Sequence, residues 1–153
     1  MNFKSTFSAI ATSALCTISL FSMADNSEKI LGQWNCEFAM SENGIDMNMN
    51  MQSNYFEDGT ANGSAMVTMT SAPMNMDLAF DVKATQTWYI DGSSIHETIT
   101  GGSVTSLKPS AFDAMLNDND LLPIGETQIS EILELTDTTL RVASDGQQIS
   151  CHR

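Results

Sequence analysis

The stretch TTLRVASDGQQISCHR, residues 138–153, decides how this chain folds. Its two segments, 138–145 and 147–153, alternate apolar and polar residues, which is the period of a strand with one buried face. Asp145-Gly146 lies between them. Asp-Gly is favoured in two-residue hairpin turns because these turns need positive φ angles. The end of the chain is therefore predicted to be a β-hairpin.

Similar turn dipeptides divide the rest of the chain. Asn43-Gly44, Asp58-Gly59 and Asp91-Gly92 each lie between segments in which Thr, Val, Ile and aromatic residues recur. The predicted strands cover residues 33–40, 45–56, 61–70, 74–90, 94–101, 127–135, 138–145 and 147–153. Short connections predict an all-β fold, an eight-stranded antiparallel meander, which can remove its free edges by closing into a barrel. Strands and helices do not alternate, so an α/β fold is not expected.

Residues 102–126 interrupt this rhythm with one long connection. The segment PSAFDAML, Pro109 to Leu116, predicts a short helix that Ser110 can cap, with Asp113 near its positive end. Long loops in compact domains are often lids or binding loops. The alternative is a plug that covers one mouth of the barrel.

The first residues have the pattern of a secretory signal peptide. Lys4 supplies a positive charge, the run from Phe7 to Phe21 is apolar, and small residues precede Asp25. We expect residues 1–24 to be removed after Ala24 and residues 25–153 to form one domain, exported to the periplasm or secreted. An N-terminal anchor or a buried helix is the alternative. No membrane span is expected in the mature chain.

The charge of the chain is strongly acidic. Asp and Glu number 19 against 6 Lys and Arg, which gives a formal net charge of −13. Such a surface repels phosphate backbones and anionic lipids, so nucleic acid is not expected as a partner. Solubility or cation binding explains the excess of acids.

Two cysteines remain after the predicted signal peptide, Cys36 and Cys151. An even number in an exported protein favours a disulfide. The alternative is a pair of thiols that bind a soft metal.

Leu31-Gly32-Gln33-Trp34 near the start and Arg153 at the end resemble the calycin superfamily, in particular bacterial lipocalin-like proteins. The resemblance implies that Gly32 and Trp34 open the first strand and that Arg153 lies across Trp34, closing one barrel end. Residues 131–153 are similar to the last three strands of such domains. The chain departs from the family in having Thr136-Asp137 without the tyrosine that follows, and no C-terminal helix.

The residue numbers support this closure independently of the resemblance. Directly opposed residues of an antiparallel pair have a constant sum of residue numbers. Trp34 with Arg153 and Cys36 with Cys151 have the same sum, and Phe38 with Ile149 follows in the same register. Opposed Cα atoms are about 4.5–5.5 Å apart, within the range that a disulfide accepts. One register therefore predicts a disulfide beside a Trp–Arg pair.

Methionines recur at every second residue in IDMNMNMQ, residues 45–52. Met47, Met49 and Met51 share a face with Ile45, and polar residues occupy the other face. Because the polar face belongs in water, the methionines are predicted to point into the barrel. Met66 and Met69 have opposite parity, so only one of them can join. Seven residues are candidates for a ligand-binding wall: Met47, Met49, Met51, Met74, Met76, Phe80 and Trp88. Tyr89 is the alternative to Trp88.

Three functions fit these methionines. The first is binding of a small apolar molecule, because methionine is flexible and suits adaptable apolar surfaces; the cavity would be about 300 Å³ or larger. The second is a periplasmic Cu(I)-binding protein, since thioethers select Cu(I) and His96 and His152 could contribute. The third is a solid core that supports an interaction or structural role of the outer surface or the 102–126 loop.

Enzyme motifs are not found in the sequence, and no catalytic residue and no cofactor are expected. His96 and Glu97 are adjacent on a strand, so their side chains should point to opposite faces, which does not make a catalytic dyad. Asp118-Asn119-Asp120 does not have the glycine and closing glutamate of a calcium loop.

Overall fold

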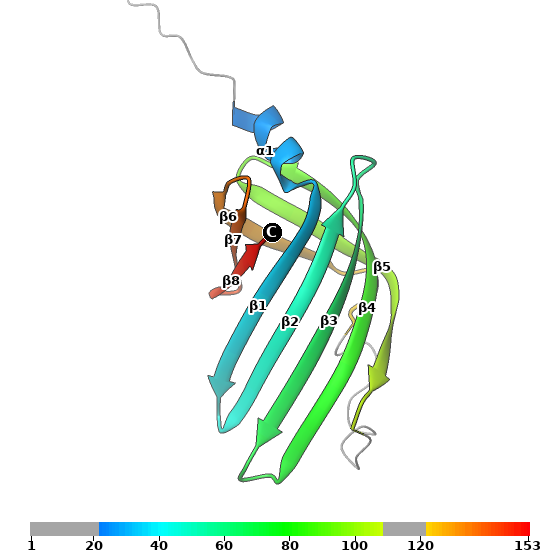
Figure 1. Ribbon diagram of the computed structural model, residues 1–153, viewed down its shortest axis with the longest axis vertical. Helices are drawn as coiled ribbons and strands as arrows, with labels where there is room; N and C mark the ends of the chain where they lie inside the picture. Colours follow the sequence, from blue (N-terminus) through cyan, green and yellow to red (C-terminus); the bar gives the residue numbers. More distant parts are fainter. Residues whose placement is uncertain (1–21, 109–121) are drawn as a thin grey trace, which may run out of the picture.

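The computed structural model describes residues 22–108 and 122–153. They form one helix and a closed antiparallel barrel in which each strand pairs with its neighbours in sequence and β8 pairs with β1 (Figure 1). The elements are α1 Ser22–Ile30, β1 Gly32–Glu42, β2 Ile45–Tyr55, β3 Thr60–Ser71, β4 Met76–Asp91, β5 Ser94–Ser106, β6 Thr127–Leu135, β7 Thr139–Ser144 and β8 Gln147–His152. The predicted eight-stranded meander barrel is confirmed.

The turns follow the dipeptides with two differences. Asn43-Gly44 and Asp145-Gly146 have positive φ at both residues, as a two-residue hairpin of the primed type requires. At Asp58-Gly59 only the glycine has positive φ, and the turn closes with the Phe56 amide donating to the Thr60 carbonyl over 2.9 Å. Asp91 stays in β4 opposite Ser94, so Gly92 and Ser93 form that turn.

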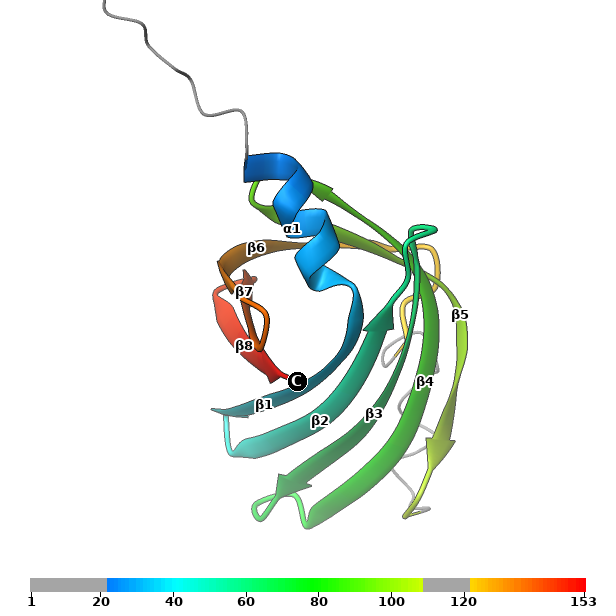
Figure 2. The same ribbon diagram turned by 45° about the horizontal axis from the view of Figure 1, so that its top comes forward.

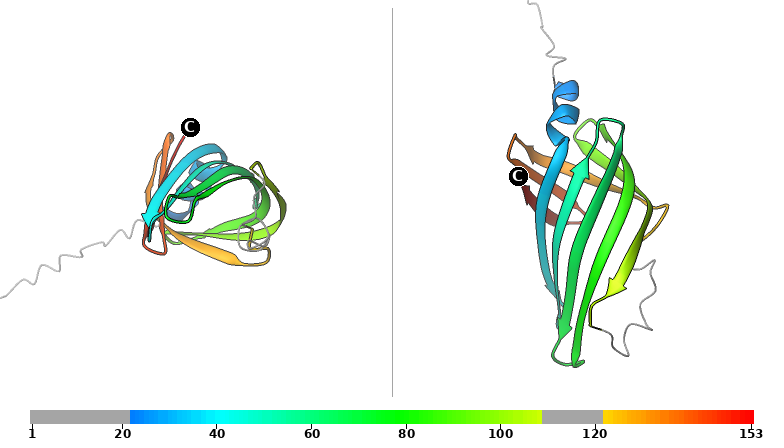
Figure 3. Two further views of the ribbon diagram at one scale, coloured as in Figure 1. Left: turned by 90° about the horizontal axis from the view of Figure 1, so that it is seen from below. Right: turned by 45° about the vertical axis from the view of Figure 1, so that its right-hand side comes forward.

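The strands are of unequal length, so the barrel has two parts along its axis: a closed ring of all eight strands and an extension formed by the longer strands. β8 pairs with β1 at Asn35–Glu37, and β6 pairs with β5 at Ser94–Thr98. The predicted partners Phe38 and Ile149 lie just beyond that pairing. β1 to β5 continue past the ring as a curved sheet, while the shorter β6 to β8 stay at the end near α1 (Figures 1 and 3).

A β-bulge in β5 changes which residues face the interior. Ile99 pairs with Gln86 and Gly101 pairs with Thr85, so Thr100 is the extra residue. Its hydroxyl donates to the Thr85 carbonyl over 3.1 Å. On one side of the bulge the inward residues are odd-numbered, and on the other side they are even-numbered, as Val104 shows by packing into the core.

The interior contains two hydrophobic cores. The closed-end core contains Ile30, Trp34, Cys36, Tyr55, Ala61, Trp88, Ile95, Leu140, Val142 and Cys151. The extension core contains Val67, Leu78, Phe80, Val82 and Leu122, with Met47, Met49, Met69 and Met76 packed against it. The predicted inward face of β2 is confirmed, because its methionines are half-buried while Asp46, Asn48 and Asn50 are exposed.

Helix α1 was not expected from the sequence, and the predicted cleavage site after Ala24 falls inside it. It lies at the closed end of the barrel (Figure 2). Its last residue, Ile30, is fully buried, and the Trp34 indole donates to the Ile30 carbonyl over 2.7 Å. The predicted helix at 109–116 lies outside the described residues. Within residues 22–108 and 122–153, no helix has the length and apolar character needed to cross a bilayer.

Candidate ligand cavity and the closed barrel end

Arg153 closes the barrel end by stacking on Trp34. Its Cζ atom lies 4.2 Å from the centroid of the indole ring, which is a cation–π contact. The guanidinium also donates to three backbone carbonyls: Nε to Asp137 over 2.6 Å, Nη2 to Lys29 over 3.0 Å, and Nη1 to Leu31. One side chain thereby links the residues before β1 to the β6–β7 connection. The resemblance to lipocalin-like proteins implied that Arg153 lies across Trp34, and it does.

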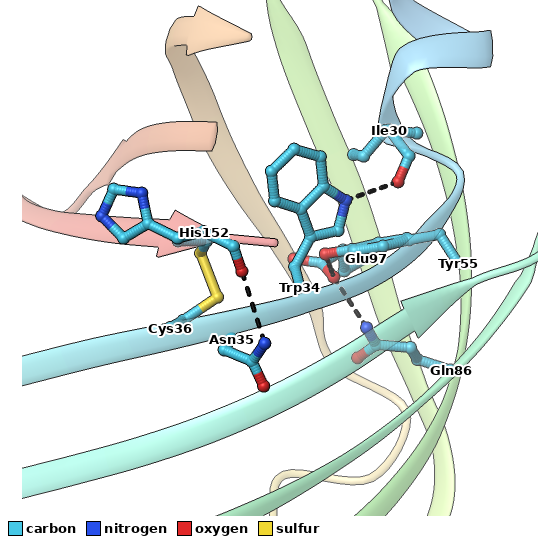
Figure 4. The surroundings of a disulfide bond; sticks show 9 residues. Ile30, Trp34, Asn35, Cys36, Tyr55, Gln86, Glu97 and His152 are labelled. Atoms are coloured by element: carbon cyan, nitrogen blue, oxygen red, sulfur yellow. Dashed lines mark hydrogen bonds between the residues drawn. A yellow bond between two sulfur atoms is a disulfide. The ribbon is translucent and has the colours of Figure 1, made fainter. Parts of the chain in front are cut away.

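The disulfide lies beside this contact. Cys36 on β1 and Cys151 on β8 are directly opposed, with 4.0 Å between their Cα atoms, and they are 115 residues apart in sequence (Figure 4). The predicted disulfide and its register with Trp34 and Arg153 are confirmed. Both sulfurs are consumed by the bond, so the cysteines do not offer thiolates to a metal.

A cavity of about 270 Å³ lies between the two cores. Ile95, Leu140 and Val142 of the closed-end core form one side, and Val67, Val82 and Leu122 of the extension core form the other. The space exists because several inward positions of the wall carry small side chains: Ser53, Gly63, Ala65, Ala84 and Ser130. Its volume is slightly below the 300 Å³ expected for a ligand site, and it shows that the barrel is not solid.

The structure brings only two of the seven candidate residues to the cavity wall. Met49 and Met51 line it. Met47, Met76 and Phe80 pack in the extension core beyond it. Met74 has 45% of its surface exposed, because β4 begins at Met76 and not at residue 74 as predicted, so Met74 lies in the β3–β4 turn.

The aromatic candidates are also separated. Trp88 faces inward, where its indole donates to the Thr60 carbonyl over 2.9 Å and meets the Tyr55 ring edge-on. This fixes it in the closed-end core, away from the cavity wall. Tyr89 faces outward with 56% of its surface exposed.

The sequence interpretation missed a polar cluster inside the barrel. Glu97 lines the cavity, and its Oε1 accepts hydrogen bonds from the Tyr55 hydroxyl over 2.8 Å and from the Gln86 amide over 2.7 Å (Figure 4). The Glu97 side chain is half-buried and forms part of the cavity wall. Ser53, Gln128 and Ser130 add further polar groups to the wall.

Burial controls the electrostatics of this cluster. It raises the pKa of Glu97, because a carboxylate loses its hydration among protein atoms, while the hydrogen bonds from Tyr55 and Gln86 act in the opposite direction. Burial also raises the pKa of Tyr55 well above its usual range, and the neighbouring Glu97 carboxylate adds to this effect. Tyr55 therefore acts as a hydrogen-bond donor at neutral pH.

One local signal could have found Glu97. In SIHETI, residues 94–99, the acid lies between Ile95 and Ile99 at period two, so it shares their inward face. The prediction that His96 and Glu97 face opposite sides is confirmed. His96 lies outside, stacked on Tyr89 with 4.5 Å between ring centroids, and its Nδ1 is 3.0 Å from the Tyr89 hydroxyl.

The histidines do not join the methionines. His96 is engaged with Tyr89, and His152 is exposed on β8. No group of three or more His, Cys, Asp or Glu side chains suited to a metal occurs within the described part of the chain. Three methionines are nevertheless adjacent across strands: Met40 pairs with Met47, and Met47 pairs with Met69.

A closed, eight-stranded up-and-down antiparallel barrel is the lipocalin architecture, so the fold is lipocalin-like. Comparisons with protein-family models and with curated protein sequences find no match. Among solved structures, a lipocalin-like protein from Bacteroides uniformis ATCC 8492 is similar, with 12% sequence identity and a TM-score of 0.44. The match covers 82% of this chain and 98% of that chain.

Proposed function

We propose that this protein binds a small, largely apolar molecule inside its barrel. The observation that carries the proposal is the cavity of about 270 Å³ between the two cores, whose wall is mainly apolar. Ligand sites are typically apolar hollows with a few placed polar groups, and the Glu97 cluster supplies such groups here. Met49 and Met51 suit this role because unbranched thioethers can adapt to ligands of different shape.

Access to the cavity is expected beside the segment that precedes β6. Leu122 and Pro123 belong to that segment and form part of the cavity wall. In the same region, the residues of β5 after Thr98 are no longer paired with β6. Fewer hydrogen bonds must therefore break there for a ligand to enter than in the continuous sheet of β1 to β4.

The proposal is tested by filling the cavity. Ala65 lines it, and Ala65→Phe should occupy part of the space; Ala39→Phe on the exposed face of β1 is the matched control. We expect the fluorescent apolar probe N-phenylnaphthylamine to bind the natural protein and the control, and to bind Ala65→Phe at least about tenfold more weakly. Equal binding by all three would place the probe outside the cavity and contradict the proposal.

Cu(I) binding is the second candidate, and one observation favours it. Met40, Met47 and Met69 occupy directly opposed positions on three neighbouring strands and are all half-buried. Opposed Cβ atoms are about 4.5–5.5 Å apart, so flexible thioethers of such a row can approach one ion. Competition with bicinchoninate for Cu(I) tests this candidate. Met47→Leu should abolish the competition. Met66→Leu changes a methionine on the exposed face and should leave the competition unchanged. Failure of the natural protein to compete would rule copper out.

We also infer that the protein is exported. The N-terminal signal pattern supports this, and the Cys36–Cys151 disulfide is compatible with an oxidising compartment. Native mass spectrometry of protein purified from its own host would separate an apolar ligand, copper and the empty barrel in one measurement.

A further inference from the structure

Glu97 is the one formally charged side chain among the described residues that line the cavity. It projects from β5, while its two hydrogen-bond donors come from β2 and β4. A carboxyl group held on three strands has a fixed position. It can therefore serve as a fixed contact point for whatever fills the space in front of it.

The hydrogen bonds to Glu97 are unevenly distributed. Tyr55 and Gln86 both donate to Oε1. No residue within 22–108 or 122–153 donates to Oε2, and that atom is not among the buried polar atoms without a partner, so it retains access to the cavity. One acceptor is thus satisfied by protein, and the second is open to a ligand.

The charge on Glu97 is also uncompensated by protein. No lysine or arginine is among the described residues that line the cavity. A carboxylate removed from water costs free energy unless a cation or hydrogen-bond donors replace its hydration, and burial raises its pKa for this reason. A positive group in the cavity would supply both the opposite charge and the missing donor.

We propose that the ligand of this cavity is a small organic amine, whose ammonium group donates to Oε2 of Glu97 and whose apolar body contacts Met49 and Met51. This inference rests on the proposed function and adds the chemical class of the ligand. A hydroxyl could donate to the same oxygen, but an ammonium adds charge assistance, which makes such hydrogen bonds about twice as strong. A carboxylate ligand would meet Glu97 with like charge and is excluded by it.

The charge of the whole chain acts in the same direction. With a net charge of −13, the protein surface concentrates cations and repels anions before they reach the barrel. Solubility and cation binding were the two explanations of the acidic composition. Under this proposal, the acidic composition also helps to select a cationic ligand.

The experiment compares three probes of nearly equal size by calorimetry on the disulfide-bonded protein at neutral pH: phenethylamine, phenethyl alcohol and hydrocinnamate. We expect phenethylamine to bind at least about tenfold more tightly than the alcohol, and hydrocinnamate most weakly. Glu97→Gln keeps the shape of the side chain and the hydrogen bonds to Oε1 but removes the charge. This variant should therefore bind phenethylamine no more tightly than phenethyl alcohol. Glu131→Gln, an equal charge change on the exposed face of β6, should leave the preference unchanged.

The outcomes separate the two proposals. If the alcohol and the amine bind equally, and Ala65→Phe weakens both, the apolar cavity function stands and the amine inference is overturned. An amine preference that survives Glu97→Gln also overturns it, because the charge responsible would lie elsewhere. If no probe binds and N-phenylnaphthylamine also does not, both proposals fall. A cooperative urea transition of Glu97→Gln shows that the variant is folded.

Discussion

The guanidinium of Arg153, the last residue, lies 4.2 Å from the ring centroid of Trp34, in the same strand register that joins Cys36 to Cys151. Its three hydrogen bonds to backbone carbonyls reach Lys29 and Leu31 before β1 and Asp137 between β6 and β7. The closed end of the barrel thus depends on one terminal side chain and one disulfide.

Replacing Arg153 with alanine should destabilise the fold. The change removes the cation–π contact and leaves carbonyl acceptors near the buried indole unpaired, and we expect a loss of about 1–2 kcal/mol in the free energy of unfolding. Urea denaturation measures it. Arg141→Ala is the control, because its ion pair with Glu134 is partly exposed to solvent and should contribute less than about 1 kcal/mol. Equal effects of the two variants would contradict the structural role of Arg153.

Loss of the disulfide should cost more than loss of Arg153. The bond joins residues 115 apart, and the loop-entropy estimate for such a loop is roughly 4–5 kcal/mol. We expect the double substitution Cys36→Ala and Cys151→Ala to lower the urea midpoint accordingly, with the slope of the transition used to check for a changed unfolded state. A midpoint that moves by less than the Arg153→Ala shift would refute the prediction.

The stability of the empty barrel should fall as the pH rises through the titration of Glu97. The folded-state pKa of Glu97 is raised above its usual value of 4.5, so the folded state holds this proton more tightly than the unfolded chain does. The stabilising contribution is complete below pH 4.5 and is lost as the pH passes the raised value. The difference in unfolding free energy between the natural protein and Glu97→Gln, followed from pH 4 to 8, isolates this effect; a flat difference would exclude it.

Removing the Tyr55 hydroxyl should move that pH window upward. The hydrogen bond from Tyr55 lowers the pKa of Glu97 and partly offsets the effect of burial. In Tyr55→Phe the carboxylate keeps only the Gln86 donor, so its pKa rises further and stability is lost at higher pH. The same denaturation series detects the shift. A window that stays in place would show that Tyr55 does not stabilise the charged form.

The exported protein should begin at Asp25 and contain no free thiol. The signal pattern places cleavage after Ala24, and the two cysteines left in the mature chain form the disulfide. Removal of residues 1–24 shortens α1 but retains Ile30 and the carbonyls of Lys29 and Leu31 that Trp34 and Arg153 use. Intact mass analysis without reductant, with and without thiol alkylation, checks both statements. A mass that includes Met23 or Ala24 would place the cleavage site elsewhere.

The sequence alone determined the features that depend on local periodicity. Alternation of side chains along a strand fixed the inward face of Met47, Met49 and Met51. The alternating segments and the turn dipeptides together predicted the number and order of strands. The pairing of Cys36 with Cys151 also followed, because an antiparallel register keeps the sum of residue numbers constant. Each of these inferences needs only neighbouring residues or one pairing rule.

Only the tertiary structure decided where the cavity lies and what lines it. The partners of Glu97, Tyr55 and Gln86, are 42 and 11 residues away and come from two other strands, so no local pattern joins them. The bulge at Thr100 and the short pairing of β6 and β8 set the relative stagger of the strands. That stagger places Met49 and Met51 at the cavity and Met47, Met76 and Phe80 beyond it, because position along the barrel axis depends on long-range pairing, whereas inward or outward direction depends on parity.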